Sequence, residues 1–261
     1  MTAPVPVPAP APAAARPAAL ASSLALVGYA LRACVPARRR IALLVPCMAA
    51  VLFGALSRSF EGDASHQFGR VAALALFGLV LPVTTLVVGD AVLGAEVRRG
   101  SFTFTWMSPI PAWRIVVGRW VGGTIVAAGA LAFAFSLAAL VAGTPDSVGP
   151  VTAAAVFGAS AYVAVFMAIG SIAQRAAVWS LAFVFLVERL LGAALSGIAQ
   201  LSPSWEARAA YVGMADVSQR LHRDGMPEGG DALLRLAIIT AVALAIASLR
   251  LPRMRMASSS D

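Results

Sequence analysis

The sequence contains no lysine, so all 20 of its basic residues are arginine. A Walker-type phosphate loop requires a lysine on the nucleotide phosphates, and a Schiff-base enzyme requires a lysine amine. The sequence therefore excludes both kinds of site. Cysteine is also scarce: Cys34 and Cys47 are the only two, and their spacing matches no metal site. We expect both to behave as small buried hydrophobic residues.

The sequence contains few charged residues of either sign. Only 12% of the 261 residues are charged and 60% are apolar, with a mean hydropathy of +0.84. A typical soluble domain has about 25% charged and about 45–50% apolar residues. We therefore predict an all-α membrane protein. The net charge of +8 is also typical of proteins that bind nucleic acid. In a membrane protein, however, excess arginine normally sets the orientation of the chain in the bilayer. We therefore expect the lipid bilayer as a partner and no nucleic acid.

The N-terminal region has two parts. Residues 1–18 are mostly proline, alanine and valine, which favours an extended, disordered tail. Residues 19–34 have helical periodicity and are too short to span a bilayer, which predicts an amphipathic helix at the membrane interface. Its apolar face is formed by Leu20, Leu24, Val27 and Leu31.

Six apolar stretches approach the ~20 residues that a helix needs to cross a bilayer. They cover residues 41–57, 71–93, 121–142, 151–172, 178–197 and 232–251. We predict a six-helix transmembrane domain over residues 41–251 and a short cytoplasmic tail over 252–261. Two connections are long, a loop over 94–120 and a segment over 198–231. The second is apolar enough either to dip back into the membrane or to form a small cap.

Arginine placement predicts the orientation. The connections on the N-terminal side of the membrane hold most of the arginines, whereas those on the other side hold most of the acids. Because positive charge is retained in the cytoplasm, both termini and the 94–120 loop are expected there. The arginines of that side are Arg16, Arg32, Arg38, Arg39, Arg40, Arg98, Arg99, Arg114, Arg119, Arg175, Arg250, Arg253 and Arg255.

The 94–120 loop carries the most distinctive pattern in the chain. An acid and two arginines precede Gly-Ser, an aromatic run, a proline turn and a further arginine. Aromatic and arginine side chains are enriched at binding hot spots, which favours a contact for a cytoplasmic partner. The same residues would also suit an aromatic belt at the lipid headgroups. The candidate contact residues are Glu96, Arg98, Arg99, Gly100, Ser101, Phe102, Phe104, Trp106, Pro109 and Arg114.

This loop resembles the segment after the second helix of ABC-2 type transporter permeases, in which Glu, Gly-Thr, a Leu-rich stretch, a Pro-containing turn, Arg and Gly-Lys follow one another. Here an aromatic run replaces the Leu-rich stretch and Arg119 replaces the lysine. The resemblance extends to nearly the whole chain, because the family also has six spans, a surface helix before the first span and an external segment between the fifth and sixth. The resemblance implies that the 94–120 loop is a coupling loop or helix.

The resemblance further implies the permease subunit of an ATP-driven exporter in a bacterial-type plasma membrane. An ABC ATPase subunit, encoded separately, would bind ATP and Mg, and a second permease chain would complete the transporter. The chain itself would hold no cofactor and no catalytic site. Its apolar lining favours an amphipathic, lipid-like, drug or peptide substrate. The alternative is a membrane anchor or assembly protein that recruits a cytoplasmic partner without transport.

Two adjacent charges, Glu188 and Arg189, fall inside the fifth expected span. Each costs about 2.5–3.5 kcal/mol at the centre of a membrane helix, so at least one needs a partner on another helix or water. Gly192 and Ser196 share the helix face of Glu188. These four residues form a possible translocation path. A structural ion pair, or a span that ends early, would explain the same pattern.

Smaller features have structural interpretations. Asp90 is expected to form a salt bridge with Arg98 or Arg99, and Pro82 is expected to kink the second span. Glycines of the third and fourth spans are expected to allow close helix packing. They are Gly118, Gly122, Gly129, Gly158 and Gly170.

Overall fold

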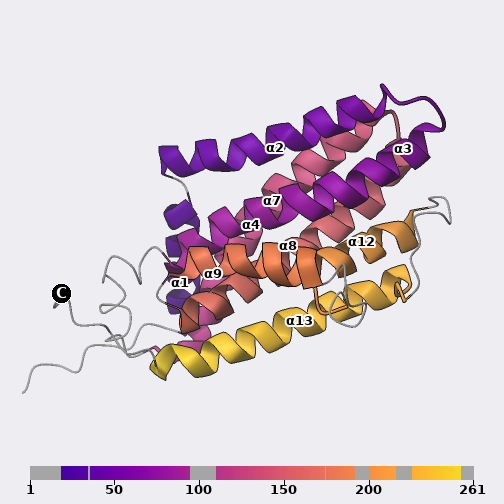
Figure 1. The fold of residues 1–261 in the computed structure, drawn as a ribbon. Helices are drawn as coiled ribbons and strands as arrows, with labels where there is room; N and C mark the ends of the chain where they lie inside the picture. Colours follow the sequence, from indigo (N-terminus) through magenta and orange to yellow (C-terminus); the bar gives the residue numbers. More distant parts are fainter. Residues whose placement is uncertain are drawn as a thin grey trace, which may run out of the picture.

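The computed structural model describes residues 19–34, 36–94, 110–173, 175–191, 200–215 and 225–253. In these ranges every regular element is a helix, which confirms the all-α prediction for this part of the chain (Figure 1). Five helices are long and apolar enough to cross a membrane. The predicted tail over 1–18, most of the 94–120 loop and residues 254–261 lie outside the described residues.

The five long helices account for five of the six predicted spans. The first is α2 (Ala37–Ser57). The second is one continuous helix formed by α3 (Ala64–Val71), η1 (Ala72–Val80), α4 (Leu81–Gly89) and η2 (Asp90–Gly94). The others are α7 (Ala112–Ala142), α8 (Val148–Ile172) after the short turn η3 (Pro145–Ser147), and α13 (Gly229–Arg250), which continues into η6 (Leu251–Arg253).

The remaining predicted span is only partly described. Two elements cover its first part, α9 (Ala176–Ala182) and η4 (Phe183–Leu191). The apolar part of this helix, Ala176–Leu186, is shorter than the other five. A sixth crossing therefore stays a prediction. Beyond it, α12 (Pro203–Met214) gives the 198–231 segment a helix of its own.

All the described spans begin before their predicted first residue, and in two of them the difference is about two helical turns or more. The second starts at Ala64 rather than 71, because the Asp63 side chain caps the helix by accepting a hydrogen bond from the backbone N–H of His66 at 3.1 Å. The third starts at Ala112 rather than 121, directly after Pro111. In both cases polar residues in the first turns interrupt the apolar run without ending the helix.

A π-helical stretch directly precedes Pro82, the residue at which a kink is predicted. The nine residues of η1 are π-helical and lead directly into α4, where Pro82 occupies the first turn. Proline has no backbone N–H to donate to the preceding turn, so the helix must change its register there. Two side-chain hydroxyls donate hydrogen bonds to backbone carbonyls near this point. Thr84 donates to the Val80 carbonyl and Thr85 to the Leu81 carbonyl, each at 2.7 Å.

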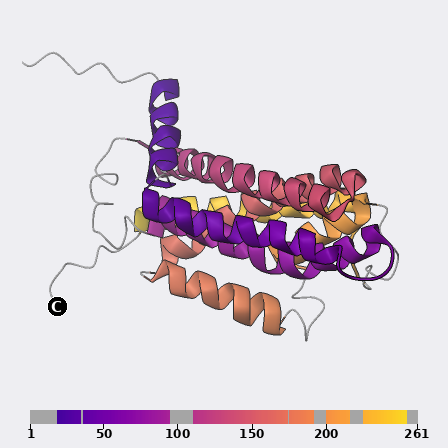
Figure 2. The same cartoon turned by 90° about the horizontal axis from the view of Figure 1, so that it is seen from above.

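Helix α1 (Ala19–Cys34) lies across the bundle instead of along it (Figure 2). It packs on the first half of α7, where two glycines allow close approach. A Cβ atom at Gly118 would lie 2.8 Å from the Cβ of Leu26, and one at Gly122 would lie 2.6 Å from the Cβ of Ala30. The packing expected of these two glycines is therefore made with α1.

The other predicted packing glycines differ among themselves. A Cβ atom at Gly158 of α8 would lie 3.0 Å from the side chains of both Ala207 and Leu81, whereas one at Gly170 would make an ordinary contact with Ala176 at 3.6 Å. The expectation for Gly129 is wrong. It is exposed on α7 and nothing lies within 4 Å of its Cβ position, because this side of the helix faces away from the bundle.

Polar contacts join the long helices inside the bundle. The hydroxyls of Ser136 on α7 and Thr152 on α8 lie 2.7 Å apart, and the Trp120 indole donates to the carbonyl of Ser160 at 3.0 Å. Large apolar side chains, by contrast, are exposed on the outside of the bundle, as expected for helices that face lipid. Examples are Phe133 on α7, Leu186 on η4 and Leu249 on α13.

Candidate functional site

Helix α12 runs from the middle of the bundle to the end at which α13 begins, and it places polar residues inside the bundle. Ser202 caps it, accepting a hydrogen bond from the backbone N–H of Trp205 at 3.4 Å, and Pro203 follows in the first turn. At its other end, Gly213 lies so close to Gly229 that a Cβ atom would be 2.3 Å from the Gly229 nitrogen. The helix is thereby held against the start of α13, with one face buried.

Glu188 of η4 lies at the junction of three elements. The Tyr162 hydroxyl of α8 donates to its Oε2 at 2.5 Å, and the Ser202 hydroxyl donates to its Oε1 at 2.8 Å. The hydroxyls of Ser202 and Ser204 are also 2.8 Å apart. We refer to Glu188, Tyr162, Ser202 and Ser204 as the Glu188 cluster. The cluster joins the partly described fifth span to α8 and to α12.

A second carboxylate, Glu206, is buried on α12 beside the sixth predicted span. Its Oε1 lies 3.6 Å from Nη1 of Arg235 on α13. The Glu206 side chain is fully buried, whereas 43% of the Arg235 side chain is exposed. Neither oxygen of Glu206 accepts a hydrogen bond within the described part of the chain. Burial raises the pKa of Glu206 to about 7, against the opposing influence of Arg235.

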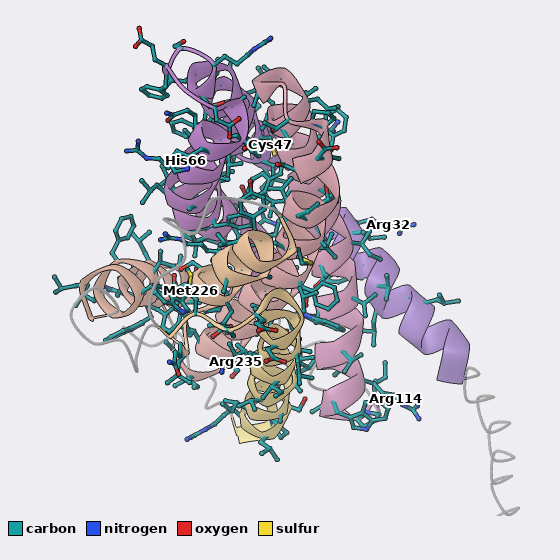
Figure 3. All side chains as sticks on the ribbon, turned by 90° about the vertical axis from the view of Figure 1, so that its right-hand side faces the viewer. Arg32, Cys47, His66, Arg114, Met226 and Arg235 are labelled. Atoms are coloured by element: carbon teal, nitrogen blue, oxygen red, sulfur yellow. The ribbon has the colours of Figure 1, made fainter. Side chains whose placement is uncertain are left out.

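Figure 3 views the molecule from the end of the bundle at which α3 and α13 begin, and it marks Arg235 and Met226. The Glu188 cluster lies deeper than this end, because Tyr162 is near the middle of α8. Within the described ranges, no group of three or more His, Cys, Asp or Glu residues could hold a metal ion. The arrangement is suited to holding η4, α8 and α12 in one relative position and to placing carboxylates next to apolar helices.

The predicted translocation residues are only partly placed. Glu188 is half-buried and accepts hydrogen bonds from Tyr162 of α8 and from Ser202 at the start of α12. Arg189 lies in η4, and Gly192 and Ser196 lie outside the described residues.

The predicted coupling contact lies mostly outside the described residues. Arg114 is the only one of its members within them. It lies in the first turn of α7, with its guanidinium carbon 5.2 Å from the ring centre of Trp113. Trp113 is exposed, so the described edge of the loop presents an aromatic residue and a cation together. The two arginines expected to pair with Asp90 are outside the described residues as well.

Arg119 is a structural residue, for which the sequence predicts only a part in topology and in the pattern of the 94–120 loop. It is fully buried in α7, where its Nη1 donates to the Val92 carbonyl of η2 at 3.1 Å. Its guanidinium also lies 5.6 Å from the ring centre of Tyr29 on α1. One cation therefore joins the second span, the third span and α1. An arginine inside an otherwise apolar helix was the available signal.

The fold defines the class of protein. Five apolar helices long enough to cross a bilayer, packed through small residues and interhelical polar contacts, make the chain a multi-pass all-helical membrane protein. No protein-family model matches the chain, and a search of the curated proteins finds no matching sequence.

Proposed function

We propose that the chain is the membrane-spanning permease subunit of an ATP-driven exporter, coupled to a separate ATPase through the 94–120 loop. The observation that carries the proposal is the pattern of that loop, which joins the second and third spans at the end of the bundle where α1 lies. Arg119 supports it, because a movement of the loop would reach η2, α7 and α1 together.

Helix directions support the orientation in the proposal. The end at which α1 lies and α7 begins carries Arg32, Arg39, Arg40, Arg114 and Arg250. The opposite end carries five acids and two arginines, namely Glu61, Asp63, Asp146, Glu228, Asp231, Arg58 and Arg70. Since positive charge is retained in the cytoplasm, the first end is assigned to the cytoplasm and both termini with it.

A sixth crossing is part of the proposal. Helix α9 begins beside α8, with Ala176 against Gly170, and η4 carries Glu188 to Tyr162, near the middle of α8. The described residues 176–191 cover about 24 Å at ~1.5 Å per residue, most of the ~30 Å hydrocarbon core. In this arrangement the Glu188 cluster lies inside the membrane, along a path for an amphipathic, lipid-like, drug or peptide substrate.

The test is purification of the tagged full chain from its native membrane in mild detergent, with identification of co-purifying proteins and an assay of ATP hydrolysis with and without vanadate. We expect a stoichiometric ATPase. Phe102→Ala, Phe104→Ala and Trp106→Ala together should release it from protein that still inserts. The matched control replaces two exposed phenylalanines and one exposed tryptophan elsewhere, Phe133→Ala, Phe185→Ala and Trp179→Ala, and should retain the ATPase.

Recovery of the chain alone, or with a partner that does not hydrolyse ATP, would overturn the proposal in favour of a membrane anchor. Full transport with a catalytically inactive ATPase would do the same. Equal loss of the ATPase from the control variant would show that the loop is not the contact.

A further inference from the structure

A groove on the outside of the bundle is not used by the proposed function. It lies between the second half of α2 and the neighbouring α3 and η1, which run side by side in Figures 1 and 2. Its volume is about 270 Å³. Six apolar residues form its walls: Phe53, Leu56, Phe60, Val71, Leu74 and Ala75.

The groove opens to the surroundings of the bundle. Leu56, Phe60 and Leu74 are each at least half exposed along its edges. Such a surface is unfavourable in water, at about 25 cal/mol per Å² of apolar area. In a bilayer its natural occupant is a hydrocarbon chain. The small side chain of Ala75 leaves the space in the wall that η1 contributes.

Two polar residues lie at the same groove, Gln67 and Arg70. Gln67 is already engaged, because its side-chain amide donates to the Glu61 carbonyl at 2.9 Å. Arg70 is exposed and forms no hydrogen bond or ion pair within the described part of the chain. Its guanidinium is therefore available to a phosphate, which it can bind through two parallel hydrogen bonds.

The depth of Arg70 matches a headgroup. The second span has 31 residues and is about 46 Å long, so it extends about 8 Å beyond a ~30 Å hydrocarbon core at each end when centred. Arg70 lies about 9 Å along the helix from Ala64, at the boundary of the core. Helical side chains lean toward the N-terminus, which here is the membrane surface, so the guanidinium reaches toward the phosphates.

The acids at the mouth of the groove select the headgroup. The Gln67 hydrogen bond holds the backbone of Glu61 beside the groove, and the exposed Glu61 carboxylate makes no hydrogen bond within the described residues. The Asp63 carboxylate is engaged by the Ser65 hydroxyl and by the backbone N–H of His66. An arginine near an unengaged acid complements a headgroup that carries both a phosphate and an ammonium.

We propose that this groove binds one zwitterionic phospholipid, with an acyl chain between α2 and η1, its phosphate on Arg70 and its ammonium group toward Glu61. The inference requires only that the chain crosses a bilayer. It does not depend on an ATPase partner or on transport.

The experiment is native mass spectrometry of the full chain in detergent, titrated with phosphatidylethanolamine or phosphatidylglycerol of identical acyl chains. We expect one phosphatidylethanolamine to be retained more strongly than phosphatidylglycerol. Arg70→Gln should weaken both by about fivefold, the size of one exposed charge pair, and Glu61→Gln should weaken phosphatidylethanolamine alone. Ala75→Trp should weaken both by filling the space for the acyl chain.

Arg58→Gln is the matched control, because Arg58 is an exposed arginine at the end of α2 that does not line the groove. It should leave both lipids bound as before. Equal weakening by Arg58→Gln and Arg70→Gln would overturn the site in favour of general electrostatic attraction. A wild-type preference for phosphatidylglycerol would overturn the headgroup assignment. Arg70→Gln and Glu61→Gln change exposed side chains, so the test does not depend on how Ala75→Trp folds.

Discussion

Glu206 is a buried carboxyl whose charge costs more in the folded protein than in the unfolded chain. Burial raises its pKa to about 7, from 4.5 for the free side chain. Between these two pH values the folded state holds a proton that the unfolded state has released. The stability that this proton supports is fully present below about pH 4.5 and is lost as the pH rises to about 7.

We therefore expect the wild-type protein to be less stable at pH 7.5 than at pH 5, with about 1–3 kcal/mol of the difference due to Glu206. Thermal unfolding in detergent measures this, and Glu206→Gln should remove most of the pH dependence. Glu228→Gln, at an exposed carboxyl just before α13, should leave it in place. If the wild-type protein became more stable from pH 5 to pH 7.5 relative to Glu206→Gln, burial would not raise the pKa of Glu206.

Ser202 connects two helical elements, because its hydroxyl both caps α12 and donates a hydrogen bond to Glu188 of η4. Ser202→Ala removes the cap and leaves a carboxylate oxygen without this donor. We expect a loss of about 1–2 kcal/mol in the free energy of unfolding. Ser202→Thr keeps a hydroxyl and should lose much less. Equal losses in the two variants would show that the effect comes from the shape of the side chain.

The contact between α1 and α7 depends on a glycine. Gly122→Val would place a side chain within 2.6 Å of Ala30, so α1 has to move away from α7. Cys34, buried at the end of α1, reports this movement: burial raises the pKa of its thiol to about 11, against the opposing charge of Arg39, and keeps it unreactive.

With Cys47 replaced by alanine, we expect Gly122→Val to increase the rate at which maleimide labels Cys34 by more than about tenfold, equivalent to about 1.4 kcal/mol of lost docking. Gly129→Val is the control on the same helix, since nothing lies near its Cβ position. It should label at the wild-type rate. An unreactive Cys34 in Gly122→Val would mean that α7, and not α1, accommodates the new side chain.

The path of the whole chain through the membrane follows from where its connections lie. In a chain without Cys34 and Cys47, single cysteines at Glu61, Asp146 and Glu228 should react with a membrane-impermeant maleimide in intact cells. Cysteines at Arg40 and Arg175 should react only after permeabilisation. The pair Arg175 and Glu228 tests the sixth crossing, because labelling of both from one side would mean that the chain between them does not span the membrane.

Most of the fold could be predicted from apolar runs, because a bilayer requires long uninterrupted helices. The boundaries could not, since Arg119 breaks the apolar run of α7, and a sequence does not show that a carbonyl of η2 accepts a hydrogen bond from it inside the bundle. Part of the candidate site could likewise be predicted from the sequence and part could not. Glu188 could be identified as a charge that needs a partner, but no periodicity relates it to Tyr162 on α8 or to Ser202 before α12.

The close fit of α1 against α7 has a consequence for the order of synthesis. Ala30 leaves the ribosome about ninety residues before Gly122, which is about 5–20 s at ordinary elongation rates. During that interval α1 has no α7 to pack on, and its apolar side chains need a temporary surface. An amphipathic helix can wait on the membrane beside the translocon. The side of α1 that carries Leu26 and Ala30 would then serve twice, first as a holding contact with lipid during biogenesis and afterwards as a permanent contact with α7.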